Sequence, residues 1–250
     1  MAFGSAPQGS FPSLLPLVSA AAISAAGVLS PLSAAVAGVT ITSYGHSALM
    51  IKGGGVSVLL NPFKAVGCAA GLTEPRLGAD LILVSSRLKD EGADVASGRL
   101  LSKPGSYKLA GLNIEGVASP HDRLGGRRFG QSTLWRWTQA GLEFAHLGGT
   151  AGPLSPAHQV LLGRPDVLII GVGGGAKVFT GQEAAEVVRE LQPRRVIPVQ
   201  YNRGNASDHC DQGPLDPFLG AMAGTKVVRS GRSISIGSGL GDATVINVLR

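Results

Sequence analysis

The first candidate functional residues of this sequence directly follow a short apolar segment. Residues 81–84 are apolar and lie between Asp80 and Ser85, which predicts a short buried strand. The side chains with chemistry that follow it are Ser86, Arg87, Lys89, Asp90 and Glu91. Because open α/β sheets bind ligands at the carboxyl ends of their strands, this exit is the leading candidate for a functional cleft.

A second candidate is the glycine-hinged loop at residues 123–130, which follows His121 and Asp122. Its arginines are Arg123, Arg127 and Arg128. Arginine forms paired hydrogen bonds with carboxylate and phosphate groups, so this loop could clamp a small anion. The alternative is a solvated loop whose arginines pair with Asp90, Asp122 or Glu91. The sequence leaves both interpretations open.

Other residues with reactive side chains have structural explanations. His46 and His146 stand beside glycines at strand ends, which favours hydrogen bonding within the fold. His158 and His209 are expected at the surface. Residues 173–175 are three glycines that resemble a phosphate loop, but the Lys and Ser/Thr that should follow are missing.

The pattern of the chain changes between its two halves. Short apolar or alternating segments separated by turns predict strands in the first half, at residues 39–44, 48–51, 56–60, 81–84, 107–109, 112–117, 133–138 and 142–146. The second half predicts strands at residues 166–170, 195–201, 226–229, 233–236 and 245–249. A helix should begin at Thr180, where Glu183 completes a capping box, and end before Pro193; residues 215–222 also read as helix. Meanders followed by β-α-β units predict two sheets with helices outside them.

Composition limits the class of protein. The 250 residues are 44% hydrophobic and 15% charged, which is enough apolar surface for a sizeable core. The 37 glycines and 15 prolines favour a strand-rich fold with many turns. The net charge of +6 should attract anions, but no basic run reaches five residues, so no nucleic-acid partner is expected.

Residues 1–37 differ from the rest of the chain. No charged residue precedes Lys52, and an apolar run ends in Ala35-Val36-Ala37, a cleavage pattern before Gly38. These features predict an export segment at 1–37 that is removed, and a folded domain at 38–250. The alternatives are the second half of a two-part plastid signal and an uncleaved segment that associates with a membrane through residues 14–29. The run at 17–29 is short for a bilayer span, which needs roughly 20 apolar residues.

Six short segments occur in an order that resembles the metallo-β-lactamase superfamily, in particular its compact metal-dependent hydrolase branch. They are residues 45–48, 60–63, 83–86, 118–122, 146–150 and 197–201. Residues 90–92, 126–130 and 135–141 resemble more closely a group of such proteins from cyanobacteria and plastids. The resemblance implies a mixed α/β fold, a four-layer αββα sandwich. It also implies an exported protein of the thylakoid lumen or plastid, or of the periplasm if the source is bacterial.

The metal ligands of that family are carried over residue by residue. Its H-x-H-x-D-H motif falls on residues 86–91, where the three histidine positions are Ser86, Leu88 and Glu91 and the aspartate is Asp90. A later histidine matches His121. The bridging aspartate falls on Gly149 and the last histidine on Gln200.

Two of the seven family ligands therefore remain. Zinc needs three or four His, Cys or carboxylate ligands, so the resemblance implies that the two-metal site is lost. The leading hypothesis is a binding or scaffold protein without a cofactor, which takes a small anionic ligand or a protein partner. Its cleft would be formed by Ser86, Arg87, Lys89, Asp90, Glu91, His121, Asp122, Gly149 and Gln200. The alternative is a hydrolase with a single zinc or iron on Asp90, Glu91 and His121.

The two cysteines, Cys68 and Cys210, are expected to form a disulfide. An even count suits an exported chain, where oxidation is permitted. In the resembling family, both lie in loops delivered to the same rim of the sandwich. The alternative is two separate thiols, one of them a soft metal ligand near His209.

Overall fold

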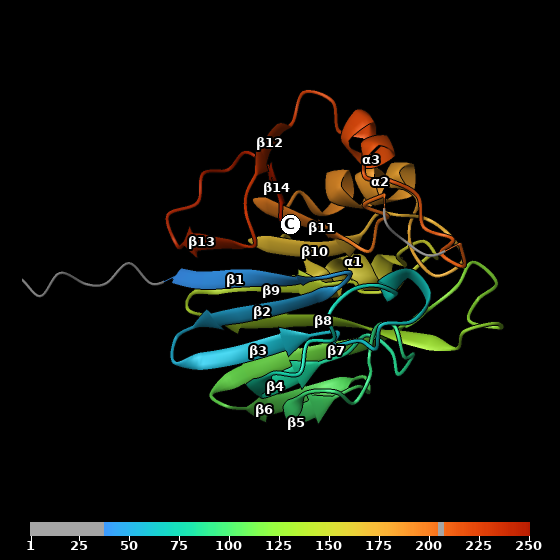
Figure 1. The fold of residues 1–250 in the computed structure, drawn as a ribbon. Coiled ribbons are helices and arrows are strands. Elements are labelled where there is room, and N and C mark those ends of the chain that lie inside the picture. Colours follow the sequence, from blue (N-terminus) through green and yellow to red (C-terminus); the bar gives the residue numbers. More distant parts are fainter. Residues whose placement is uncertain (1–37, 205–207) are drawn as a thin grey trace, which may run out of the picture. The chain divides into compact units, whose positions relative to one another are not determined.

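Two β-sheets face each other in the computed structural model, which describes residues 38–204 and 208–250 (Figure 1). The first has the order β13-β1-β2-β3-β4-β5. Its strands are β1 (Gly38–Gly45), β2 (Ala48–Gly53), β3 (Val56–Leu60), β4 (Gly78–Leu83), β5 (Ser97–Leu101) and β13 (Ser233–Gly237). The meander from β1 to β3 is antiparallel, whereas β3, β4 and β5 pair in parallel.

The second sheet has the order β12-β14-β11-β10-β9-β8-β7-β6. Its strands are β6 (Gly105–Leu109), β7 (Leu112–Pro120), β8 (Gln131–Gln139), β9 (Leu142–His146), β10 (Val167–Gly171), β11 (Arg195–Val199), β12 (Lys226–Arg229) and β14 (Val245–Val248). Strands β9, β10, β11 and β14 run parallel. Their carboxyl ends therefore lie at one edge of the sheet, where the loops that follow them can meet.

Alternation along the strands builds two cores. In β10, Ile169 belongs to the core between the sheets, while Leu168 and Ile170 belong to the core under the helices. Trp135 and Phe144 contribute from neighbouring strands to the core between the sheets. Successive side chains of a strand point to opposite faces, so a fully apolar strand such as β10 can serve both cores.

The helices are α1 (Pro156–Leu162), α2 (Gly181–Leu191) and α3 (Asp216–Ala221), with a short 3-10 helix η1 (Gly67–Ala69). The capping box predicted at α2 is present: Thr180 Oγ1 accepts from Glu183 N at 3.2 Å, and Glu183 Oε2 accepts from Thr180 N at 2.7 Å. Buried residues of all three α-helices join the core on the outer face of the second sheet.

The mixed α/β fold with two sheets is confirmed, and every predicted strand and helix is present near its expected bounds. Three elements were missed, namely β5, α1 and η1. The predicted four-layer sandwich has a layer of helices outside each sheet, but the layer that covers the outer face of the first sheet is thin. Met50, Leu59, Ile82 and Val84 are covered there by partly buried residues of the strands and loops, such as Leu77 and Ala96. The connection from β4 to β5 contains no helix.

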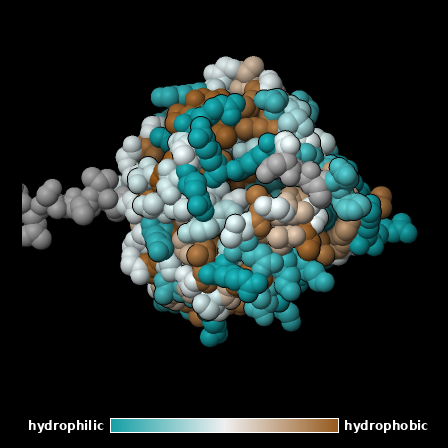
Figure 2. Space-filling view, in the orientation of Figure 1, coloured by the Kyte–Doolittle hydropathy of each residue, from teal (hydrophilic) through white to brown (hydrophobic). Residues whose placement is uncertain are grey.

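The surface carries no large apolar stretch on the face shown in Figure 2, where hydrophilic side chains are interspersed with small hydrophobic patches. Among the described residues, the most exposed large apolar side chains are the isolated Val160 and Leu124. Single exposed apolar residues are normal on soluble proteins. No helix in the described part of the chain is long and apolar enough to span a membrane. The predicted export segment at 1–37 lies outside the described residues.

Candidate functional site

Loops from both sheets meet around the end of β4. Ser85 joins them: its N–H donates to Asn61 Oδ1 at 2.8 Å, and its carbonyl accepts from Thr133 N at 2.7 Å. Trp135 of β8 donates its indole N–H to Val84 O at 3.0 Å. These bonds tie the end of β4 to the second sheet and fix where residues 86–91 begin.

Glu91 lies at the centre of this edge with its side chain fully buried. Its Oε1 lies 2.5 Å from His121 Nε2, and the two groups form a buried ion pair when the imidazole is protonated. Ser86 Oγ donates to Oε1 at 2.7 Å, and Gln200 Nε2 donates to Oε2 at 2.6 Å. Both carboxylate oxygens are therefore engaged. We call Ser86, Glu91, His121 and Gln200 the Glu91 network.

The charge of Glu91 is stabilised inside the protein. Burial alone would raise its pKa, but contact with His121, the charge of Lys177 and the hydrogen bond from Ser86 outweigh burial and lower the pKa to about 2. Glu91 is thus a carboxylate at neutral pH.

Gly149 makes room for this carboxylate. A Cβ atom added there would lie 2.3 Å from Glu91 Oε2 and 2.5 Å from His121 Nε2, closer than side-chain carbons approach. Gly92 is needed on the other side, since a Cβ at that position would lie 1.8 Å from Ser86 O. An acidic side chain at 149 and Glu91 in its present position exclude each other.

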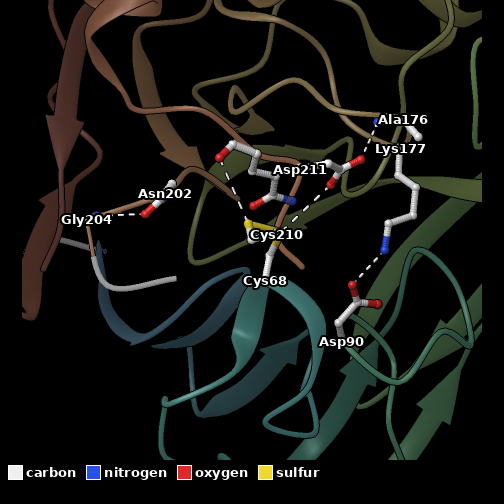
Figure 3. Close-up of a disulfide and its surroundings, with 9 residues drawn as sticks. Cys68, Asp90, Ala176, Lys177, Asn202, Gly204, Cys210 and Asp211 are labelled. Carbon is white, nitrogen blue, oxygen red and sulfur yellow. Dashed lines mark hydrogen bonds and ion pairs between the residues drawn. A yellow bond between two sulfur atoms is a disulfide. The ribbon is translucent and has the colours of Figure 1, made fainter. Parts of the chain in front are cut away.

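Asp90, which the sequence placed in the same metal group, has a different partner. Lys177 Nζ donates to Asp90 Oδ2 at 2.6 Å, and both side chains are 14% exposed (Figure 3). The sequence did not indicate Lys177 as a partner, although this residue follows the glycine run at 173–175 by two residues. Arg87 and Lys89 are exposed at the surface.

The donor set does not fit a metal ion. Among the described residues, no three or more His, Cys, Asp or Glu side chains form a group that could hold one. The predicted set of Asp90, Glu91 and His121 is divided between the Lys177 ion pair and the Glu91 network. Zinc sites need at least three convergent protein ligands, so no reaction step through a metal follows from this geometry.

Two further histidines border the site. The side chain of His146 is fully buried, neither ring nitrogen has a hydrogen-bond partner among the described residues, and burial lowers its pKa to about 4. His46 is nearly buried, its Nε2 has no partner there either, and burial is the main cause that lowers its pKa. The expectation that these side chains hydrogen bond within the fold is wrong for those nitrogens. Burial alone does not supply a partner.

The remaining histidines differ in exposure. His209 is exposed, as expected. His158 is only half-buried, because it completes the capping of α1: its backbone N–H donates to Ser155 Oγ at 3.2 Å, and its Nε2 lies 3.0 Å from Ala118 O.

Asp122 shapes the arginine loop. Its carboxylate accepts backbone N–H groups of Leu124, Gly126, Arg128 and Phe129 at 2.7–3.1 Å. Burial raises the pKa of Asp122, but these bonds outweigh burial and lower it. Asp122 is therefore a structural residue of the loop.

The arginines of the loop at residues 123–130 differ in their partners. Arg123 pairs with Glu183 of α2 at 2.5 Å and donates to Val178 O at 3.1 Å. The partner of Arg123 is therefore on α2 and is none of Asp90, Asp122 and Glu91, the partners that the solvated-loop alternative named. Arg128 lies 4.8 Å over the Phe129 ring, and both Arg127 and Arg128 are exposed.

The predicted disulfide between Cys68 and Cys210 is confirmed, with 4.5 Å between the Cα atoms (Figure 3). It joins η1 to the loop after β11, so the alternative of two separate thiols is wrong. The next residue, Asp211, accepts from Ala176 N at 2.8 Å. The disulfide therefore anchors the loop after β11 beside the glycine run at the same rim.

The two facing sheets and the loops that meet at their edge define the metallo-β-lactamase fold. A proposed zinc-dependent hydrolase of that superfamily from Thermotoga maritima superposes with a TM-score of 0.68 at 23% identity, over 85% of this chain and 100% of that one. A proposed metal-dependent hydrolase from Parabacteroides distasonis gives 0.56 at 17% identity, over 85% and 94%. Identities this low establish the fold alone.

The sequence itself establishes the family. The model of the beta-lactamase superfamily domain matches residues 40–200, so this chain belongs to the beta-lactamase superfamily. The UPF0173 metal-dependent hydrolase of Thermus thermophilus is 26% identical over 191 residues, which cover 66% of this chain and 84% of that protein. A UPF0173 protein of Pyrococcus furiosus is 26% identical over 185 residues, with the same coverage.

Proposed function

We propose that this chain is a non-hydrolytic member of the superfamily, a binding protein in which the Glu91 network takes the place of a two-metal site. The observation that carries the proposal is the buried carboxylate of Glu91, held on both oxygens by its own protein. A hydrolytic metal site must keep a coordination position open for water or substrate. Here the corresponding centre is filled by protein atoms, and Gly149 is the residue that allows it.

The ligand that we propose is a small anion, with a protein as the alternative partner. The net charge of +6 favours anions over cations at long range. Four exposed cationic side chains lie in the segments that carry Glu91 and His121, namely Arg87, Lys89, Arg127 and Arg128. None of these observations indicates a hydrolytic reaction. The positions of Asp90, Glu91 and His121 do not favour the alternative of a single-metal hydrolase.

Metal content tests the proposal directly. The chain is expressed in medium containing zinc, iron and manganese, purified without chelator, and analysed by elemental mass spectrometry. We expect no stoichiometric metal in the wild-type protein. One or two ions bound per chain would overturn the proposal.

A restored variant is the positive control. Ser86→His, Leu88→His, Glu91→His, Gly149→Asp and Gln200→His together return the family's ligand types to their five altered positions. Metal uptake by this variant, with none by the wild type, attributes the loss to these residues. Hydrolysis of a phosphodiester probe by the wild type, abolished by Glu91→Gln, would contradict the proposal independently.

We also propose that the protein is exported, to the thylakoid lumen or plastid, or to the periplasm of a bacterium. The disulfide supports an oxidising compartment. The charge-free segment before Gly38 supports a removed leader. Mass spectrometry of the native protein should find a mature chain that begins near Gly38, and an intact Met1 in a membrane fraction would instead indicate an anchor.

A further inference from the structure

A groove of about 840 Å³ opens beside the carboxyl end of β1. Ligand sites for small molecules commonly have volumes of about 300–1,000 Å³. The walls come from Ser43–Gly45, from the loop at residues 72–77, and from Arg203, Arg232 and Arg250. No residue of the Glu91 network lines it. We call it the arginine groove.

The charge of the groove is positive. The arginines that line it are Arg76, Arg203, Arg232 and Arg250. Glu74 is the only acidic side chain among the described lining residues, and it lies 2.6 Å from Arg76. Among the described lining residues, no acidic side chain is paired with Arg203, Arg232 or Arg250.

Two of these arginines are held in place before any ligand arrives. Arg232 lies 5.3 Å over the Tyr44 ring, and its Nε donates to Ser43 O at 3.3 Å. Arg203 lies 5.2 Å over the Tyr201 ring, and its Nη2 donates to Leu249 O at 3.0 Å. Each guanidinium has five N–H donors, and these contacts leave most of them for an anion.

The backbone around Arg203 is also fixed. Gly204 N donates to Asn202 Oδ1 at 2.7 Å, which closes a tight turn around this residue (Figure 3). Asn202 N donates to Gly213 O at 2.8 Å, and the disulfide at Cys210 anchors the same loop. A fixed guanidinium loses less conformational freedom when it binds, so more of its interaction energy appears as affinity.

The groove is amphipathic. Leu72, Pro75 and Leu77 line it on the loop before β4, and the Tyr44 ring adds apolar surface. A ligand that placed only a charge among the arginines would leave this wall in contact with water. An apolar chain attached to the charged group would cover it.

We infer that the arginine groove binds an amphipathic monocarboxylate. The carboxylate lies on Arg203 and Arg232, and the apolar body packs against Leu72, Pro75 and Leu77. This deepens the proposed binding function by naming a ligand class, at a groove that shares no residue with the Glu91 network.

Titration calorimetry of the full chain with decanoate, below its micelle concentration, tests the inference. We expect saturable binding with one site per chain, and much weaker binding of acetate and of decanol, which keep only the charge or only the chain. Arg232→Gln and Arg203→Gln should each weaken decanoate binding about tenfold or more, as for loss of a charge-assisted hydrogen bond. Both substitutions are at exposed positions, so folding can be checked by circular dichroism.

Arg99→Gln is the matched control, because Arg99 is exposed on β5 and does not line the arginine groove. It removes the same charge and should leave decanoate affinity unchanged. Arg127→Gln tests the arginine loop as a rival site for the anion. Loss of binding in Arg127→Gln but not in Arg232→Gln would place the anion site at the loop and overturn the inference. Decanol binding as tightly as decanoate, or decanoate no better than acetate, would overturn it as well.

The outcome is separable from the proposed function. If the protein binds stoichiometric metal and also binds decanoate, the non-hydrolytic proposal is refuted and the inference about the arginine groove stands. If it binds neither metal nor decanoate, the non-hydrolytic proposal stands and the inference about the groove is refuted.

Discussion

Gly149→Ala tests the central steric argument about the Glu91 network. The added Cβ would lie 2.3 Å from Glu91 Oε2 and 2.5 Å from His121 Nε2. Both neighbours are fully buried, so neither can swing into solvent to relieve the overlap. Gly149 does not have a positive φ angle, so the effect is steric and not a matter of backbone conformation.

The expected magnitude follows from what must move. If Glu91 is displaced, it loses the ion pair with His121 and the hydrogen bonds from Ser86 and Gln200. Breaking a buried ion pair costs about 3–5 kcal/mol. For a chain of this size, that corresponds to a fall in Tm of roughly 6–20 °C.

A double-mutant cycle with Glu91→Ala identifies the contact. Glu91→Ala alone should be destabilising because His121 and Gln200 lose their partner. Once that side chain is gone, Gly149→Ala should cost little more, so the coupling energy between the two positions should approach the whole cost of Gly149→Ala, about 3–5 kcal/mol. Urea unfolding monitored by Trp fluorescence and circular dichroism measures all four proteins.

Gly239→Ala is the control, since a Cβ there meets nothing within 4 Å. It should change stability little. Two results would refute the reasoning: a Gly149→Ala protein within about 1 kcal/mol of the wild type, or a double variant that loses the sum of the single effects.

Three further predictions concern pH, the disulfide and a second ion pair. The pKa of His146 in the folded protein is about 4, below its ordinary value of 6.5, so the unfolded chain binds a proton at higher pH than the folded chain does. The free energy of unfolding should therefore fall by about 3 kcal/mol as the pH drops from 6.5 to 4. In His146→Leu, the free energy of unfolding measured with urea should depend less on pH across that range, and an unchanged dependence would contradict the low pKa of His146. Replacing Cys68 and Cys210 by Ser should lower unfolding free energy by about 4–5 kcal/mol in the chain-entropy model, whereas two titratable thiols in unreduced wild-type protein would show that the bond does not form. Lys177→Met should cost about 1–3 kcal/mol by leaving Asp90 without its partner, and the double variant with Asp90→Asn should recover part of the loss; no recovery would exclude the pairing.

Local sequence was sufficient for most secondary structure. Alternation predicted β8, and a continuous apolar run predicted β10, because burial on one or both faces requires those patterns. The start of α2 followed from the Thr180 and Glu183 capping box. Those signals act within a few residues. Two of the three missed elements show the limit: β5 depends on parallel pairing with β4, and α1 has only 7 residues.

The sequence also predicted a site at the carboxyl ends of the strands and the replacement of most of the family's metal ligands. It did not reveal what replaced them. The partner of Glu91 at Gln200 is 109 residues away, and Lys177 is 87 residues from Asp90. The arginine groove likewise draws Tyr44, Arg203 and Arg232 from distant segments. Hydrogen bonds and ion pairs act over a few ångströms, so the chemistry of these groups was decided only when the two sheets brought their loops together.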